Sequence, residues 1–245
     1  MGNMKKILVI LSLLFFLIGI GMAYIPDDLF IETGSIVAVL ILAVPAFYGM
    51  WKIYGPKGIL AVITLGLFAL TIETIGIYTG FPYSHFDYLM PFGYKLFGTT
   101  PWTVFVAWSP LVIGAFLLSQ AWFKKCWSQI LVYLGLLIGT DLVLDPGAVA
   151  RGLWQYESIG LWYNVPVQNF LGWIFSGTIV YLILKFGLPN KKINQGNLII
   201  GSLSTLLSLS LWSGVAKIYE LWLPFIIGLL LVVVIMYGLL KKPSH

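Results

Sequence analysis

Two aspartates, Asp141 and Asp145, lie at the end of an almost uninterrupted apolar run and are four residues apart. On a helix this spacing places both carboxyl groups on one face. An apolar environment favours the neutral form of a carboxyl group, and a like-charged neighbour strengthens that preference. A neutral carboxylic acid can donate a proton, so we expect Asp141, one turn deeper, to be a general acid. Asp145 would be its ionised partner near Arg151. The alternative is that Arg151 and its loop bind the pair as a structural staple.

Aromatic and amide side chains surround these aspartates in the sequence. Asn169 and Trp173 open the next apolar run with helical spacing. The connections on the same predicted side of the membrane are rich in Trp and Tyr, which fits either an interfacial aromatic belt or a cavity whose ring faces stabilise a cation. The candidate substrate-binding residues are Asn169, Trp173, Trp154, Tyr156, Arg151, Tyr78 and Tyr88.

A third carboxyl group, Glu73, lies within another apolar run. It shares a predicted helix face with Gly76 and Gly80, and a Gly-x-x-x-Gly spacing lets a neighbouring helix approach closely. We therefore expect Glu73 to point into the bundle. An ionisable group at bilayer depth is costly, and this makes each of the three acids a candidate functional residue.

The elements that position these residues are membrane spans. Of the 245 residues, 60% are hydrophobic and only 9% are charged, whereas a soluble domain has about 25% charged residues. We predict one transmembrane domain over residues 1–245, an all-α integral membrane bundle of about eight helices. Its third and fourth helices are joined by a re-entrant or interfacial aromatic connection, 80–100. Pro146 should end the fifth helix at Asp145. The predicted helices are 7–24, 34–54, 59–79, 101–123, 127–145, 166–186, 198–216 and 221–240.

The lysines indicate the orientation of this bundle. Three cationic residues, Lys95, Arg151 and Lys217, fall on the side of the acidic connections, where Asp27 and Asp28 also lie. The remaining eleven of the 14 fall on the other side, which predicts a protein of the cell membrane with both termini cytoplasmic. These eleven are Lys5, Lys6, Lys52, Lys57, Lys124, Lys125, Lys185, Lys191, Lys192, Lys241 and Lys242.

The sequence favours chemistry without a cofactor or metal. No Gly-rich dinucleotide motif follows a strand pattern, and two histidines cannot build a His-rich metal site. The single cysteine, Cys126, rules out an intrachain disulfide. The net charge of +5 comes from basic residues distributed between the apolar spans, so we expect no nucleic-acid partner.

Two sequence blocks resemble the membrane-bound carotenoid biosynthesis family, which includes CruF-type carotenoid 1,2-hydratases and archaeal bisanhydrobacterioruberin hydratases. One block begins at Glu73 and runs through Gly76, Gly80 and Pro82 to Tyr88, although it departs from the family pattern after Pro82. The other combines Asp141, Asp145, Pro146, Gly152, Trp154, Tyr156, Glu157, Tyr163, Asn164, Pro166, Asn169, Gly172 and Trp173.

The resemblance implies an intramembrane hydratase that adds water to a terminal C=C bond of an acyclic carotenoid or isoprenoid. Such a reaction needs a proton donor, a shielded tertiary cation and a placed water, which match the residues above. Asp141 would supply the proton, and Glu73 or Asn169 would orient the water.

Two other functions remain open from the sequence. Asp141 and Asp145 resemble half of the aspartate-rich diphosphate–Mg²⁺ site of an intramembrane prenyltransferase. A lipid-binding protein or proton-coupled transporter could use Glu73 and Asp141 as a proton relay, but the internal repeats of many transporters are not visible in the sequence.

Overall fold

The computed structural model describes residues 2–25 and 29–241. Asp27, Asp28 and Lys242, which entered the charge argument above, lie outside the described residues. The long helices are α1 (Gly2–Gly21), α2 (Leu29–Tyr54), α3 (Pro56–Thr79), α5 (Ser109–Trp122), α6 (Cys126–Arg151), α7 (Val167–Gly187), α8 (Gln195–Ile218) and α9 (Trp222–Leu240). The short elements are η1 (Met22–Tyr24), α4 (Val104–Ala107), β1 (Phe86–Tyr88), β2 (Lys95–Leu96), β3 (Thr100–Pro101) and β4 (Trp154–Tyr156).

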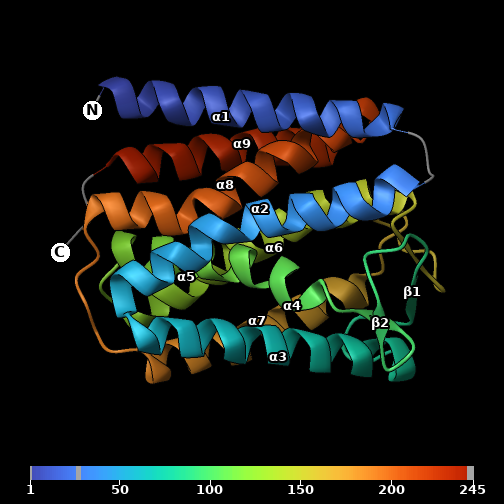
Figure 1. Cartoon of the computed structure of the whole chain (residues 1–245), viewed down its shortest axis with the longest axis horizontal. Coiled ribbons are helices and arrows are strands. Elements are labelled where there is room, and N and C mark those ends of the chain that lie inside the picture. Colours follow the sequence, from blue (N-terminus) through green and yellow to red (C-terminus); the bar gives the residue numbers. More distant parts are fainter. Residues whose placement is uncertain (1, 26–28, 242–245) are drawn as a thin grey trace.

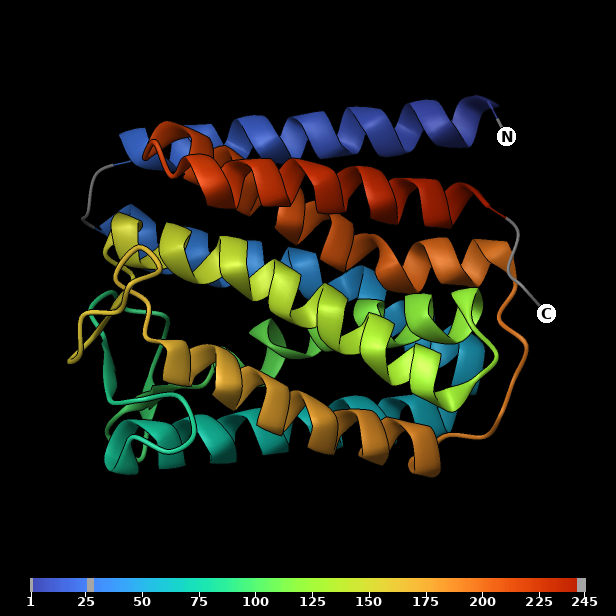
Figure 2. The same cartoon turned by 180° about the vertical axis from the view of Figure 1, so that it is seen from behind.

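Eight spans in the described ranges are long and apolar enough to cross a membrane, which confirms the predicted all-α bundle. In Figures 1 and 2, α1 and α9 lie along one side and α3 and α7 along the opposite side, with α8 between them. The described ends, Gly2 and Lys241, lie at the same end of the bundle, as an even number of spans requires.

Helix α8 is the most central element and packs against α1, α2, α5, α6 and α9. Its small residues permit these close contacts. A Cβ atom at Gly49 of α2 would lie 2.3 Å from Cα of Gly201, so the two backbones touch at this crossing. The serine-rich sequence of α8 therefore serves helix packing along most of its length.

Helix α6 extends beyond its predicted end at Asp145 and runs through Pro146 to Arg151. A proline inside a helix leaves the carbonyl four residues earlier without its N–H donor. Here that carbonyl belongs to Leu142, and the indole Nε1 of Trp162 donates to it at 3.0 Å. The replacement bond explains why the helix continues, and it places both aspartates well inside α6.

The predicted span 101–123 is divided into α4 and α5. Pro110 lies in the first turn of α5, where its missing N–H breaks the hydrogen-bond ladder. The short α4 follows the aromatic connection and packs against α2 and α3. The division matters for the site because Thr103, Val104 and Trp108 face a cavity there.

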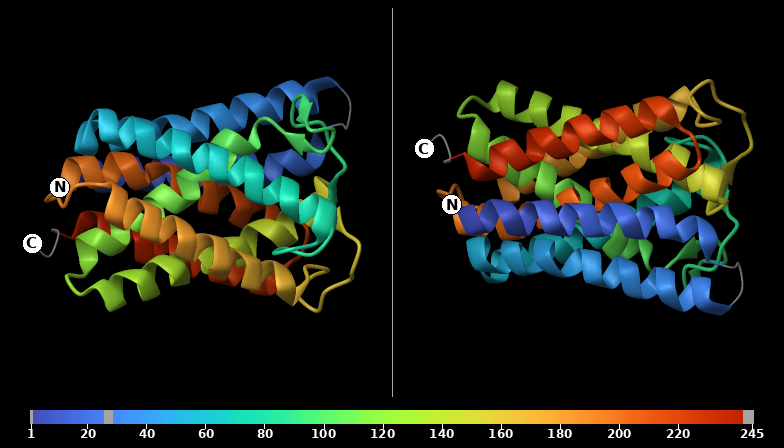
Figure 3. Two further views of the ribbon diagram at one scale, coloured as in Figure 1. Left: turned by 90° about the horizontal axis from the view of Figure 1, so that it is seen from below. Right: turned by 90° about the horizontal axis from the view of Figure 1, so that it is seen from above.

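The connection between α3 and α4 folds as a cap over one end of the bundle (Figure 3). Strand β1 pairs antiparallel with β4, so that Phe86 is opposite Tyr156 and Tyr88 is opposite Trp154. We refer to residues 80–103 and 152–166 together as the cap. It includes the aromatic connection that the sequence predicted to be re-entrant or interfacial, and its paired strands join two connections that are distant in sequence.

Glycines bring the cap close to the helices, but not in the way that the Gly76–Gly80 spacing predicted. Gly80 ends α3 in a left-handed conformation, and a Cβ atom there would lie 2.9 Å from the ring of His85. Gly172 of α7 leaves room for Tyr83, whose Cδ1 would lie 2.5 Å from an added Cβ. The glycine face of α3 therefore receives the side chains of the cap instead of a neighbouring helix.

Candidate active site

A cavity of about 200 Å³ lies between the cap and helices α2, α3, α4, α5, α7 and α8. Its wall is mostly apolar and aromatic, and its polar groups come chiefly from the cap, α3 and α7. This composition is typical of a binding site for a lipophilic ligand with a few orienting polar groups.

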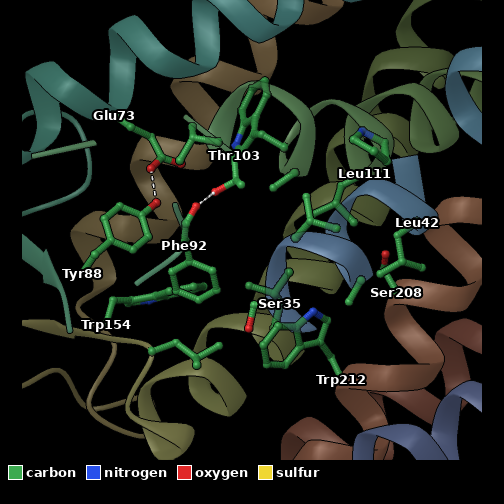
Figure 4. A pocket seen from close by; sticks show the side chains of 18 of the residues that line it. Ser35, Leu42, Glu73, Tyr88, Phe92, Thr103, Leu111, Trp154, Ser208 and Trp212 are labelled. Atoms are coloured by element: carbon green, nitrogen blue, oxygen red, sulfur yellow. Dashed lines mark hydrogen bonds between the residues drawn. The ribbon is translucent and has the colours of Figure 1, made fainter. Parts of the chain in front are cut away.

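Glu73 of α3 lines this cavity directly. The hydroxyl group of Tyr88, on β1, donates a hydrogen bond to its Oε2 atom, as Figure 4 shows. The prediction that Glu73 points into the bundle is therefore correct. The bond from Tyr88 leaves the second carboxyl oxygen of Glu73 available for chemistry at the cavity.

Asp141 and Asp145 are joined by Asn169 of α7. The Nδ2 atom of Asn169 donates to Oδ2 of Asp141 at 3.0 Å and also to Oδ2 of Asp145. The hydroxyl group of Tyr156, on β4, donates to the same Asp145 oxygen at 2.7 Å. Asp141, Asp145 and Asn169 are only 2%, 3% and 2% exposed, respectively. We call these four residues the aspartate cluster.

The aspartate cluster meets the cavity through Asn169 and Tyr156, which line it. The two aspartates are not among the lining residues and lie behind these two side chains. Asp141 Oδ1 is buried and has no hydrogen-bond partner within the described residues. The residue predicted to be the proton donor is therefore one layer away from the ligand space.

Three tyrosines keep their protons beside these acids. Burial, together with the nearby carboxyl groups of Glu73, Asp141 and Asp145, raises the pKa of Tyr83 well above its ordinary value. Burial and the neighbouring acids raise the pKa of Tyr88 and of Tyr156 in the same direction. A phenol with a raised pKa remains protonated, so each of the three can donate a hydrogen bond.

Stacked rings form the wall beside Glu73 and Asn169. Trp173 of α7 stacks on Trp108 at a centroid distance of 5.3 Å. The ring of Tyr83 lies on Trp173 as well, at a centroid distance of 6.3 Å. The face of an aromatic ring attracts positive charge. Trp108 was not recognisable from the sequence, because it lies within an apolar run, where a tryptophan is indistinguishable from a packing residue.

Five of the seven predicted substrate-binding residues line the cavity, and two do not. Tyr78 is 61% exposed, and its hydroxyl group donates to the carbonyl of Phe97 outside the cavity. Arg151 donates to the carbonyls of Met22 and Ile25, so its described contacts tie α6 to the end of α1. The position beside Asp145 predicted for Arg151 is taken by Tyr156 and Asn169. The five lining residues are Asn169, Trp173, Trp154, Tyr156 and Tyr88.

The donor set of the site is oxygen-rich but dispersed. Within residues 2–25 and 29–241, no group of three or more His, Cys, Asp and Glu side chains has an arrangement suited to a metal ion. The polar groups that reach the cavity include a carboxyl group, an amide and phenols, which can exchange protons and orient a water molecule.

The fold and the site together define a multispanning membrane protein with an aromatic cavity for a lipophilic ligand beside a group of acids. A family model described as "Carotenoid biosynthesis protein" matches residues 32–235, and the chain belongs to this family. The chain is also 32% identical over 201 residues to the bisanhydrobacterioruberin hydratase of Haloarcula japonica, covering 78% of this chain and 67% of that protein. No solved structure matches the chain.

Proposed function

We propose that this protein is an intramembrane hydratase that adds water to a terminal C=C bond of an acyclic carotenoid or related isoprenoid. The observation that carries the proposal is the position of Glu73, a carboxyl group on the wall of an aromatic cavity that Asn169 and Tyr156 of the aspartate cluster also line. Membership of the carotenoid biosynthesis family and the similarity to a hydratase support the same reaction class.

Glu73 is the better proton donor in this proposal, in place of Asp141. A general acid must come within hydrogen-bond reach of the atom that it protonates. Glu73 lines the cavity, whereas Asp141 lies behind Asn169. Tyr88 holds one oxygen of Glu73, so the proton is carried by the other oxygen, which can face the alkene.

The addition proceeds through a tertiary cation. The alkene π electrons take the proton from Glu73, forming a C–H bond at the less substituted carbon and a cation at the other carbon. The faces of Trp173 and Trp108 stabilise that cation. A water oxygen then forms the C–O bond, and the proton that this water releases returns to the Glu73 carboxylate.

The aspartate cluster places the water and stabilises the cation. The amide hydrogens of Asn169 are directed at the two aspartates, which leaves the amide oxygen as its acceptor for water. Asp145 accepts hydrogen bonds from both Tyr156 and Asn169, the pattern of a carboxylate anion. A negative group one layer behind the cavity wall favours positive charge in the substrate.

The test is expression of the full chain in a strain that accumulates acyclic carotenoids, in water enriched in heavy oxygen. We expect a product heavier by one labelled water per hydrated end, and the same product from purified protein in the presence of a metal chelator. A product enlarged by a prenyl unit, with activity lost to chelator and restored by Mg²⁺, would instead support the prenyltransferase.

A further inference from the structure

The cavity has a second polar end, away from Glu73 and Tyr88. Ser35 of α2 and Ser208 and Trp212 of α8 line it, and Figure 4 shows these three side chains on the opposite side of the pocket from Glu73. Leu42 and Leu111 line the wall close to them. An otherwise apolar cavity thus has hydrogen-bonding groups at both of its ends.

The polar atoms of these three side chains have no hydrogen-bond partner in the part of the chain that the structure describes. Ser208 is only 5% exposed, so bulk water does not satisfy its hydroxyl group. Two other serines on the same helix behave differently, since Ser210 donates to the carbonyl of Leu206 and Ser213 to that of Leu209. A buried polar group without a partner is unfavourable, so a ligand atom that completes these bonds is favoured.

The chemistry of the three groups selects a neutral hydroxyl group. The indole N–H of Trp212 only donates, so the ligand atom must accept a hydrogen bond. The serine hydroxyls can both donate and accept, so they can also accept a hydrogen bond from the ligand hydroxyl. No charged side chain lines this end of the cavity among the described residues, and an ionic ligand group would therefore lack a counter-charge.

We propose that Ser35, Ser208 and Trp212 form a hydroxyl-binding subsite, which selects isoprenoid chains already carrying a hydroxyl group at a distance from the reacting double bond. The subsite deepens the proposed function, because it defines which lipophilic chains enter the cavity in a productive register. Its function is recognition only and involves no bond making, so it can be tested without turnover.

The test uses a matched pair of saturated ligands that cannot be hydrated, tetrahydrolinalool and its parent alkane. Each is equilibrated with the full-length protein in lipid nanodiscs, and retained ligand is measured by mass spectrometry against empty discs. We expect Ser208→Ala and Trp212→Phe each to weaken binding of the alcohol about three- to tenfold, the range of one neutral hydrogen bond, and to leave binding of the alkane unchanged.

The control is Ser210→Ala, which removes a hydroxyl group from the same helix that bonds to the backbone and does not line the cavity. It should change neither ligand. Equal losses for alcohol and alkane would overturn the subsite. No loss of alcohol binding with Ser208→Ala would also overturn it, and would mean that these residues hold only an ordered water. Because neither ligand has a double bond, the result is independent of whether the protein is a hydratase.

Discussion

Two polar groups of residues lie at opposite ends of the bundle and differ in what they face. At the cap end are Glu73 and the aspartate cluster. At the other end, Lys185 of α7 donates to Oε1 of Gln120 at 3.0 Å and to Oε1 of Gln129 at 2.8 Å. Both groups use helices α6 and α7, and both bury hydrogen bonds between helices.

The difference is access to the cavity. None of Lys185, Gln120 and Gln129 lines it, and the lysine bonds link α7 to α5 and α6. At the cap end, by contrast, Glu73, Tyr156 and Asn169 present polar atoms to a ligand space. Buried polar residues in a membrane bundle are therefore not functional by burial alone, and the comparison separates helix-joining groups from groups that can meet a substrate.

The strongest test of this comparison is Glu73→Gln, which keeps the shape of the side chain and removes the acid. We expect it to lower hydration by at least ~10²-fold, the usual loss for a general acid. Asp141→Asn should lose less, because Asp141 does not line the cavity. Product formation per amount of folded membrane protein measures both, with the exposed Asp87→Asn on β1 as control. A larger loss in Asp141→Asn would restore Asp141 as the proton donor.

The second test removes the phenol that connects the aspartate cluster to the cavity. Tyr156→Phe should reduce activity by about tenfold, because Asp145 loses one charge-assisted hydrogen bond. The pKa of Tyr156 lies well above its ordinary value of 10.0, so deprotonation of the phenol should not remove this loss as the pH is raised to 10.0. Rates at several pH values measure it, and the exposed Tyr94→Phe is the matched control. A loss that disappears within this range would contradict the hydrogen-bond role.

The third test addresses the other end of the bundle. Lys185→Met should leave activity per folded protein within about twofold, yet lower the free energy of unfolding by about 1–3 kcal/mol, because the partly buried oxygens of Gln120 and Gln129 both lose the lysine donor, and Gln129 keeps only the longer bond from Tyr181. Thermal unfolding in detergent and turnover measure the two effects. The exposed Lys192→Met should change neither. A selective loss of activity in Lys185→Met would show that the two ends are coupled.

The fourth test has the smallest expected effect on the protein and concerns which end faces the cytoplasm. We propose that the lysine-bearing end is cytoplasmic and that the cap faces the other side. Cysteines introduced at Asn190 and Ser158 should then react with a membrane-impermeant thiol reagent from opposite sides and leave activity unchanged. The exposed Cys126 is first replaced by alanine. Labelling of both positions from one side would refute the proposed topology.

The sequence by itself determined the class of fold and many of the residues of the candidate site. Long apolar runs can satisfy their backbone groups in a bilayer only as helices, and this is why all eight spans were visible. The acids and Asn169 were also recognisable, since polar groups are conspicuous in an apolar chain. Membership of the family followed from the two blocks around Glu73 and Asp145, and the family model agrees.

Only the tertiary structure decided which of these groups line the cavity. The course of α6 beyond Pro146 depends on Trp162, which is 20 residues from Leu142 in the sequence. The pairing of β1 with β4 brings Tyr88 to Glu73 and Tyr156 to Asp145, while Arg151 and Tyr78 lie elsewhere. Helical spacing specifies neighbours within one helix, so periodicity could identify the acids. A cavity wall is built from several elements whose contacts are non-local. Periodicity therefore could not show that Glu73 lines the cavity and that Asp141 lies behind Asn169.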